Sequence, residues 1–274
     1  MSEAVELSIT ATPGAPTDPV PLRGGQGRLV RAALPSVLVL GTAGSSGAST
    51  TALGLAAAAV ADSDGDIWPI VVDATLGGGD VALRGCDAAK PVSTLQEWLD
   101  TAHPELASTV QACTGRTTTG VRVLPRSPDP LPRRETLVSV ARHLETAGLL
   151  TVFDAGAPVT SRLAAPLLAD PRVGLAITVA ARPDAVNRLQ PALRWLDEQY
   201  SEFLIGDAVI VLTEQVKDSG KASVDHVRTY LGSWVRDVVT IPFDVHLAGG
   251  GIISWHRLAA ETRDAYLRLL GVLR

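Results

Sequence analysis

A glycine- and serine-rich segment near residue 44 has the composition of an anion-binding loop. It follows the apolar run 37–40 and leads into the alanine-rich stretch 49–62. A buried strand that passes through such a loop into a helix directs backbone N–H groups and the positive end of the helix dipole at one point. The segment therefore predicts a phosphate site, although a plain strand-to-helix turn would use its glycines in the same way.

Two aspartates end later apolar runs. Asp73 closes the run 67–73 and Asp154 closes the run 149–154. Ligands of parallel sheets bind at the carboxyl ends of the strands, so both side chains are expected near the glycine-rich loop. A carboxylate there can act on Mg²⁺, and the alternative for Asp154 is the capping of a helix.

Short apolar runs alternate with longer helical patterns from residue 34 to the C-terminus. The expected strands are 37–40, 67–73, 121–124, 149–154, 174–180, 208–213 and 238–242, and the expected helices are 49–62, 94–101, 135–146, 161–170, 184–200, 224–231 and 255–273. This alternation predicts an α/β fold with a doubly wound, mostly parallel sheet of about seven or eight strands and helices on both faces. Residues 1–33, rich in proline and glycine, are expected to form a flexible tail before one domain over 34–274.

Composition excludes several classes of protein. The net charge of -5 supplies no basic field for bulk nucleic-acid binding, and no apolar run is long enough to cross a bilayer. Only two cysteines occur and we find no signal peptide, so we expect unpaired thiols and a cytoplasmic protein. Lysine is scarce, which limits any chemistry that needs it: the chain holds only Lys90, Lys217 and Lys221.

The segment from Ala43 to Thr50 resembles the deviant Walker A loop of the MinD/ParA family of P-loop ATPases. Glycines at 44 and 47 and the hydroxyl pair at 49 and 50 match that pattern, but Ala43 and Ala48 stand where the family has lysines. The resemblance implies that a lysine at 48 would reach the β and γ phosphates. A lysine at 43 would cross to the partner's nucleotide in a sandwich dimer, and we therefore expect no ATP-dependent sandwich dimer; another kind of dimer stays open.

Further similarity to this family extends over about 34–274. Asp73 matches the first aspartate of the first switch, whereas Thr75 replaces the second one, which positions the attacking water in the family. Asp154 resembles the Walker B aspartate. The segment with Pro242 and Phe243 resembles the adenine side of the site, where the base pocket often also has an asparagine at the position of Thr213.

The resemblance implies a site for ATP or ADP with Mg²⁺, and the absence of any nucleotide stays open. No catalytic residue is expected, because the usual lysine and aspartate positions hold Ala43, Ala48 and Thr75. Ser49 and Asp154 are the expected metal ligands. The expected cofactor-binding residues are Gly44, Ser45, Ser46, Gly47, Ala48, Ser49, Thr50, Asp73, Thr213, Pro242 and Phe243.

These losses favour a pseudo-ATPase that acts through protein contacts as a localisation, assembly or regulatory factor. Similarity to actinobacterial CpaE/MinD-like proteins suggests a secretion, pilus or partition machine as partner, with peripheral membrane association through that partner. One alternative is an active ATPase in which Arg84 or Arg182 supplies the missing charge. A second is an NAD(P)-binding Rossmann oxidoreductase, because glycines at 41, 44 and 47 fit its loose pattern, but the chain lacks the Tyr-x-x-x-Lys pair of the short-chain enzymes.

Overall fold

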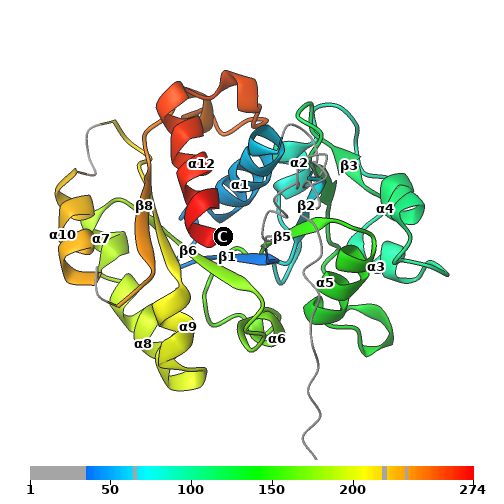
Figure 1. Ribbon diagram of the computed structural model, residues 1–274, viewed down its shortest axis with the longest axis horizontal. Helices are drawn as coiled ribbons and strands as arrows, with labels where there is room; N and C mark the ends of the chain where they lie inside the picture. Colours follow the sequence, from blue (N-terminus) through cyan, green and yellow to red (C-terminus); the bar gives the residue numbers. More distant parts are fainter. Residues whose placement is uncertain (1–34, 64–66, 218–220, 232–233) are drawn as a thin grey trace, which may run out of the picture. The chain divides into compact units, whose positions relative to one another are not determined.

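The described part of the chain contains one eight-stranded sheet with helices on both of its faces (Figure 1). The computed structural model describes residues 35–63, 67–217, 221–231 and 234–274, so the tail expected over 1–33 lies outside the described residues. The strands are β1 (Val37–Gly41), β2 (Pro69–Asp73), β3 (Gly115–Arg116), β4 (Arg122–Leu124), β5 (Leu150–Asp154), β6 (Gly174–Ala180), β7 (Val209–Thr213) and β8 (Asp237–Ile241). The predicted α/β class and mostly parallel sheet are confirmed.

The strand order places β1 in the interior of the sheet, between β5 and β6. The order is β3-β4-β2-β5-β1-β6-β7-β8, and the β3–β4 pair is antiparallel while the others are parallel. In the Rossmann order of dinucleotide-binding enzymes the first strand lies beside the second. Here β5 separates β1 from β2, so the topology argues against an oxidoreductase of the Rossmann type.

Two layers of helices bury the two faces of the sheet. Alternate residues of β1 explain this, because Val37 and Val39 pack toward one layer and Leu38 and Leu40 toward the other. The first layer holds α1 (Ala48–Asp62), α2 (Val81–Gly85), the 3₁₀ turn η2 (Trp255–Arg257) and α12 (Ala260–Leu273). The second holds α3 (Leu95–Leu99), α4 (Ala107–Cys113), α5 (Leu137–Thr146), α6 (Ala165–Leu168), α7 (Pro183–Val186), α8 (Leu189–Gln199), α9 (Glu202–Asp207) and α10 (Lys221–Leu231).

The last helix packs side by side with α1 in the first layer (Figure 1). A Cβ at Gly54 would lie 2.3 Å from the ring of Tyr266, so the glycine permits this close approach. Tyr266 is fully buried, and its hydroxyl donates a hydrogen bond to the carbonyl of Thr50 at 3.4 Å. No helix in the described ranges has both the length and the apolar character of a membrane span.

Three predicted helices are shorter or broken in the structure. The helix expected over 184–200 is divided into α7 and α8, because Pro191 lacks the N–H that would bond to the carbonyl of Asn187. The helix expected over 255–273 begins as η2 and starts again at Ala260, where Oδ2 of Asp244 accepts a hydrogen bond from the amide of Ala259 at 2.8 Å. Only one turn, α6, forms within the predicted helix 161–170.

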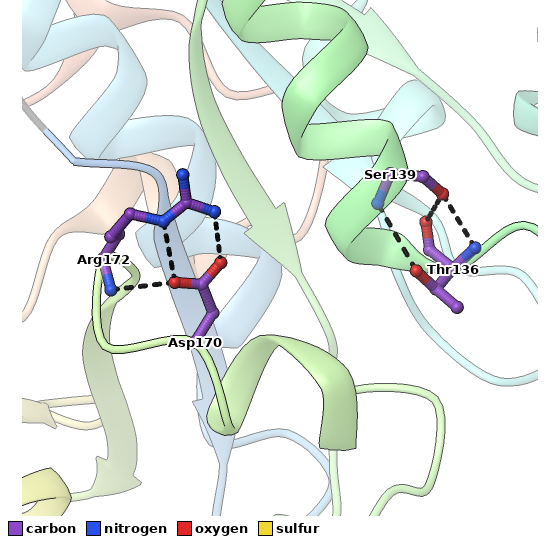
Figure 2. A network of polar contacts seen from close by, with 4 residues as sticks. All are labelled: Thr136, Ser139, Asp170 and Arg172. Atoms are coloured by element: carbon purple, nitrogen blue, oxygen red, sulfur yellow. Dashed lines mark hydrogen bonds and ion pairs between the residues drawn. The ribbon is translucent and has the colours of Figure 1, made fainter.

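Local polar contacts fix where α5 and β6 begin, as Figure 2 shows. Oγ1 of Thr136 accepts a bond from the amide of Ser139, whose hydroxyl oxygen accepts one from the amide of Thr136. Arg172 donates from its amide, Nε and Nη2 to the carboxylate of Asp170, at 3.0, 3.0 and 2.7 Å. These contacts cap the helix and close the turn that leads into β6, which lies beside β1.

Candidate functional site

A cavity of about 600 Å³ opens beyond the carboxyl ends of β1, β7 and β8. It is lined by the loop 43–50, by 213–215, by 241–244, and by side chains of α2, α11 (Val245–Ala248) and α12. This is the edge at which parallel α/β sheets bind ligands. The cavity brings together the predicted residues of the glycine-rich loop with Thr213, Pro242 and Phe243, whereas Asp73 and Asp154 do not line it.

A side chain of β6 anchors the glycine-rich loop. The hydroxyls of Ser46 and Thr178 lie 2.9 Å apart in a buried hydrogen bond, and the amide of Ser46 donates to the carbonyl of Ala43 at 3.3 Å. A Cβ at Gly41 would lie 2.2 Å from Oγ of Ser46, so only glycine fits where the loop leaves β1. Ser46 therefore holds the loop in place, and its hydroxyl is already committed within the protein.

Two side chains at the carboxyl end of β7 hold the same loop in place. Oγ1 of Thr213 donates to the carbonyl of Ser46 at 3.0 Å, and Nε2 of Gln215 donates to the carbonyl of Ser45. Gly47 has φ +90°, and a Cβ there would lie 2.9 Å from Cγ2 of Thr213. Thr213 lies where the family resemblance places a base-reading asparagine, but its hydroxyl bonds to the loop. Sequence reasoning missed Gln215, which belongs to no motif.

Most backbone N–H groups of the loop have no acceptor. Helix α1 begins here, and the first amides of a helix lack partners within the helix. In the described part of the chain no hydrogen bond is made by the amides of Gly44, Ser45, Gly47, Ala48, Ser49 and Thr50. Unpaired donors at the positive end of a 15-residue helix form a cradle for an anion such as phosphate.

Arg84 is the only lysine or arginine among the described residues that lines the cavity. Its Nη1 donates to Oγ1 of Thr50 at 3.0 Å, and its buried Nε has no partner within the described ranges. Arg182, the other candidate from the sequence, is exposed and pairs with Asp184 at 3.2 Å away from the cavity. Of the two candidates, only Arg84 can contact a ligand in this cavity.

The loop after β2 bonds its polar groups to one another. Oδ1 of the buried Asp73 accepts from the amide and the hydroxyl of Thr75, at 2.9 and 2.6 Å, and Oδ2 accepts from the amide of Gly79 at 2.5 Å. The hydroxyl proton of Thr75 is therefore directed at Asp73. A neutral hydroxyl held in this way cannot serve as the carboxylate that positions or deprotonates a water.

Asp154 lies fully buried at the end of β5. Its Oδ1 accepts from the amide of Gly156 at 3.1 Å, whereas its Oδ2 has no hydrogen bond of normal geometry in the part of the chain that the structure describes. Burial raises the pKa of Asp154 to about 6, and the neighbouring Asp73 carboxylate adds to this while the Ser49 hydroxyl opposes it. With a pKa of about 6 the carboxyl is mostly ionised at pH 7, and with Ser49 it offers Mg²⁺ the oxygen ligands that this ion prefers.

The opposite wall is formed by the segment after β8. Pro242 and Phe243 are half-buried there, and the amide of Phe243 donates to Oε2 of Glu214 at 3.4 Å. Asp244 caps α11 by accepting from the amide of His246 at 2.7 Å. The cavity thus has an apolar wall that suits a base, a cradle that suits phosphates and, nearby, an unpartnered buried carboxylate oxygen that suits a cation. These groups fit a nucleotide with Mg²⁺.

Similar folds occur among solved structures, although the sequence matches no protein-family model and no curated protein. A ParA family ATPase from Chlorobium tepidum TLS has a TM-score of 0.66 at 17% identity, covering 87% of this chain and 99% of that chain. The cell division ATPase MinD of Pyrococcus furiosus has a TM-score of 0.57 at 16% identity, covering 86% and 97%. The cobyrinic acid a,c-diamide synthase of Mycobacterium smegmatis, with bound ATP analogue and magnesium, has a TM-score of 0.54 at 14% identity, covering 86% and 93%. The chain therefore has the fold of the ParA and MinD P-loop ATPases.

Proposed function

We propose that this chain is a degenerate MinD/ParA-like P-loop protein, a pseudo-ATPase that binds adenine nucleotide weakly and acts by contacting other proteins. One observation carries the proposal. The loop keeps its free backbone donors, while Ala43, Ala48 and Thr75 occupy the positions that need charged side chains for hydrolysis. Phosphoryl transfer depends on positioned charge, so the cradle can hold phosphates without promoting their transfer.

In this proposal the chain's own groups have separate roles. The free amides of the loop bind the phosphates, and the apolar wall at Pro242 and Phe243 contacts the base. Ser49 and Asp154 would hold Mg²⁺, which neutralises phosphate charge when it is bound. Thr213 and Gln215 keep the loop in shape, and Thr75 keeps the neighbouring loop closed on Asp73.

Apolar side chains near the cavity support a role in protein contacts. Leu76 in the loop after β2, Leu83 in α2 and Val245 in α11 are each more than 70% exposed. Large exposed apolar side chains on segments that border a ligand site are suited to a partner that reads the occupancy of that site. The role we propose is localisation, assembly or regulation of a cytoplasmic or membrane-peripheral machine, of the secretion, pilus or partition type.

The decisive experiment is a phosphate-release assay on the full chain with ATP and Mg²⁺, combined with calorimetric titration of the same sample. We expect measurable nucleotide binding and no release above the rate of a protein-free control. Release at the rate of a lysine-bearing ParA or MinD ATPase, measured side by side, would contradict the proposal. Adding candidate partner machines to the nucleotide-loaded protein then tests whether occupancy changes their association.

An active ATPase with an unusual loop is the second candidate, and the position of Arg84 in the cavity is the observation that favours it. This candidate predicts Mg²⁺-dependent phosphate release that Asp154→Ala abolishes and Arg182→Ala leaves intact. The pseudo-ATPase predicts no release from the wild type or from either variant. The assay therefore separates the two candidates without reference to a partner.

A further inference from the structure

Helix α2 and its N-cap place two opposite charges on the cavity. Asp80 and Arg84 lie one helical turn apart, with the amide of Arg84 donating to the carbonyl of Asp80 at 2.9 Å, and both residues line the cavity. No ion pair joins these two residues in the described part of the chain. Each charge is therefore available to a ligand in the cavity.

The guanidinium lies at the nucleoside end of the expected ligand. Arg84 donates to Thr50, and the carbonyl of Thr50 accepts from the hydroxyl of Tyr266. The carbonyl of Arg84 accepts from the amide of Ile253 at 2.7 Å, in the segment that follows Asp244 and α11. Asp244 follows directly on Pro242 and Phe243, the wall that suits the base. The Arg84 guanidinium thus lies between the wall that suits the base and Thr50 at the start of α1, where the inner phosphates would lie.

The carboxylates lie toward the other end. Asp80 follows Gly79, whose amide donates to Asp73, and Asp73 lies opposite Asp154 where β2 pairs with β5. Asp154 is the carboxyl that would hold Mg²⁺ together with Ser49. The neighbouring loop positions, Ala43 and Ala48, carry no charge. A terminal phosphate would therefore meet acidic groups and free amides, with Mg²⁺ as its only positive partner.

We propose that Arg84 is the phosphate-binding cation of this site and that it recognises the inner phosphates, so that the site takes a nucleoside diphosphate at least as tightly as the triphosphate. Of the five N–H donors of an arginine, one is used on Thr50 within the described ranges. The other N–H groups of its two terminal nitrogens have no partner within the described ranges, and they can pair with phosphate oxygens from the cavity wall. This inference rests on the proposed function and names the ligand class of the same cavity.

The test is calorimetric titration of the full-length protein with ADP and with ATP, each with Mg²⁺. We expect the dissociation constant for ADP to be equal to or below that for ATP. Arg84→Ala should weaken ADP binding by about tenfold to a hundredfold, the usual worth of a charge-assisted hydrogen bond. Arg84→Lys should keep part of that affinity, and thermal unfolding of both variants checks that they fold. Arg182→Ala is the matched control and should bind like the wild type.

Asp80→Asn provides an independent test of the inference. Removing this carboxylate should improve ATP binding more than ADP binding, because only the triphosphate reaches toward the acidic end. ATP binding that is tenfold tighter than ADP binding, an Arg84→Ala protein that binds ADP like the wild type, or a wild type that binds neither nucleotide would each overturn the inference. The first two results leave the pseudo-ATPase proposal intact. Rapid phosphate release would contradict that proposal, but the role of Arg84 in nucleotide binding could still be measured.

Discussion

The loop after β1 leaves its amides without partners, whereas the loop after β2 bonds its aspartate, threonine and glycine to one another. Both loops lie at the same edge of the sheet, separated by β5. The first loop has kept what an anion needs, since backbone donors survive any change of side chain. The second holds Thr75 where the resemblance to MinD/ParA ATPases places the aspartate that positions water. In our proposal, nucleotide binding and turnover therefore depend on separate loops of this fold and can be lost separately.

Breaking the second loop should have the largest effect on stability. Asp73→Ala leaves the amides of Thr75 and Gly79 without their buried acceptor, and we expect the free energy of unfolding to fall by about 4 kcal/mol. Chemical denaturation measures this change. The control is Asp80→Ala at an exposed carboxylate nearby that makes no capping bond, with an expected change within about 0.5 kcal/mol. Equal losses from both variants would contradict a structural role for Asp73.

The buried carboxyl between the two loops should make stability depend on pH. Burial raises the pKa of Asp154 from 3.8 to about 6, so the folded state holds a proton that the unfolded chain has already released between these values. The contribution of this group to stability is complete below about pH 4 and is lost as the pH rises through about 6. The stability of Asp154→Asn relative to the wild type should therefore rise by about 2.5 kcal/mol from about pH 4 to about pH 7.

Denaturant unfolding of both proteins at these two pH values, without nucleotide or Mg²⁺, gives the difference directly. Other titrating groups cancel in the comparison because the two proteins share them. A stability difference that does not change with pH would show that Asp154 is solvated in the folded protein. A fall in place of the expected rise would mean that its pKa is lowered.

The first loop depends on backbone shape, so a methyl group in the wrong place should disturb it. Gly47→Ala adds a Cβ at φ +90° and 2.9 Å from Thr213, which we expect to cost about 2 kcal/mol of stability and to weaken ADP binding. Gly206→Ala in α9 is the matched control, because a Cβ there would meet nothing within 4 Å and the residue does not line the cavity. Thermal unfolding and nucleotide titration should separate the two variants, and identical behaviour would argue against a defined loop shape.

The smallest effect is expected from the side-chain brace of this loop. Gln215→Ala removes the bond to the carbonyl of Ser45, a residue held at φ 61°, and should weaken ADP binding by about fivefold, roughly 1 kcal/mol. Gln190→Ala removes an amide that donates to Tyr230 away from the cavity, and should leave ADP binding unchanged. Matching losses in both variants would point to a general loss of stability.

The glycine-rich loop is predictable from the sequence because its geometry is local. A strand, glycines and a helix start follow one another within residues 37–62, and the structure places β1, the loop and α1 there. The contacts that decide its chemistry are not local. Gln215 reaches Ser45 across 170 residues and Arg84 reaches Thr50 across 34, so only the packing of the sheet brings them together.

Helix α2 is a second feature that the sequence does not predict. The glycines at 77–79 indicate a loop, and the sequence pattern predicts no helix between them and residue 94. The structure has a short helix over Val81–Gly85, which turns Arg84 into the cavity. The sequence presents Arg84 and Arg182 as equal candidates, and their environments in the folded chain distinguish them: one lines the cavity, and the other pairs with Asp184 in solvent.

A single-turnover experiment tests the separation of binding from turnover most directly. Labelled ATP with Mg²⁺ is mixed with an excess of the full-length protein, and the nucleotide that stays with the protein is identified over time. Our account predicts that bound ATP is recovered intact after hours, because the loop after β1 holds phosphates and the loop after β2 supplies no group to activate water. Recovery of ADP and phosphate within minutes would contradict it.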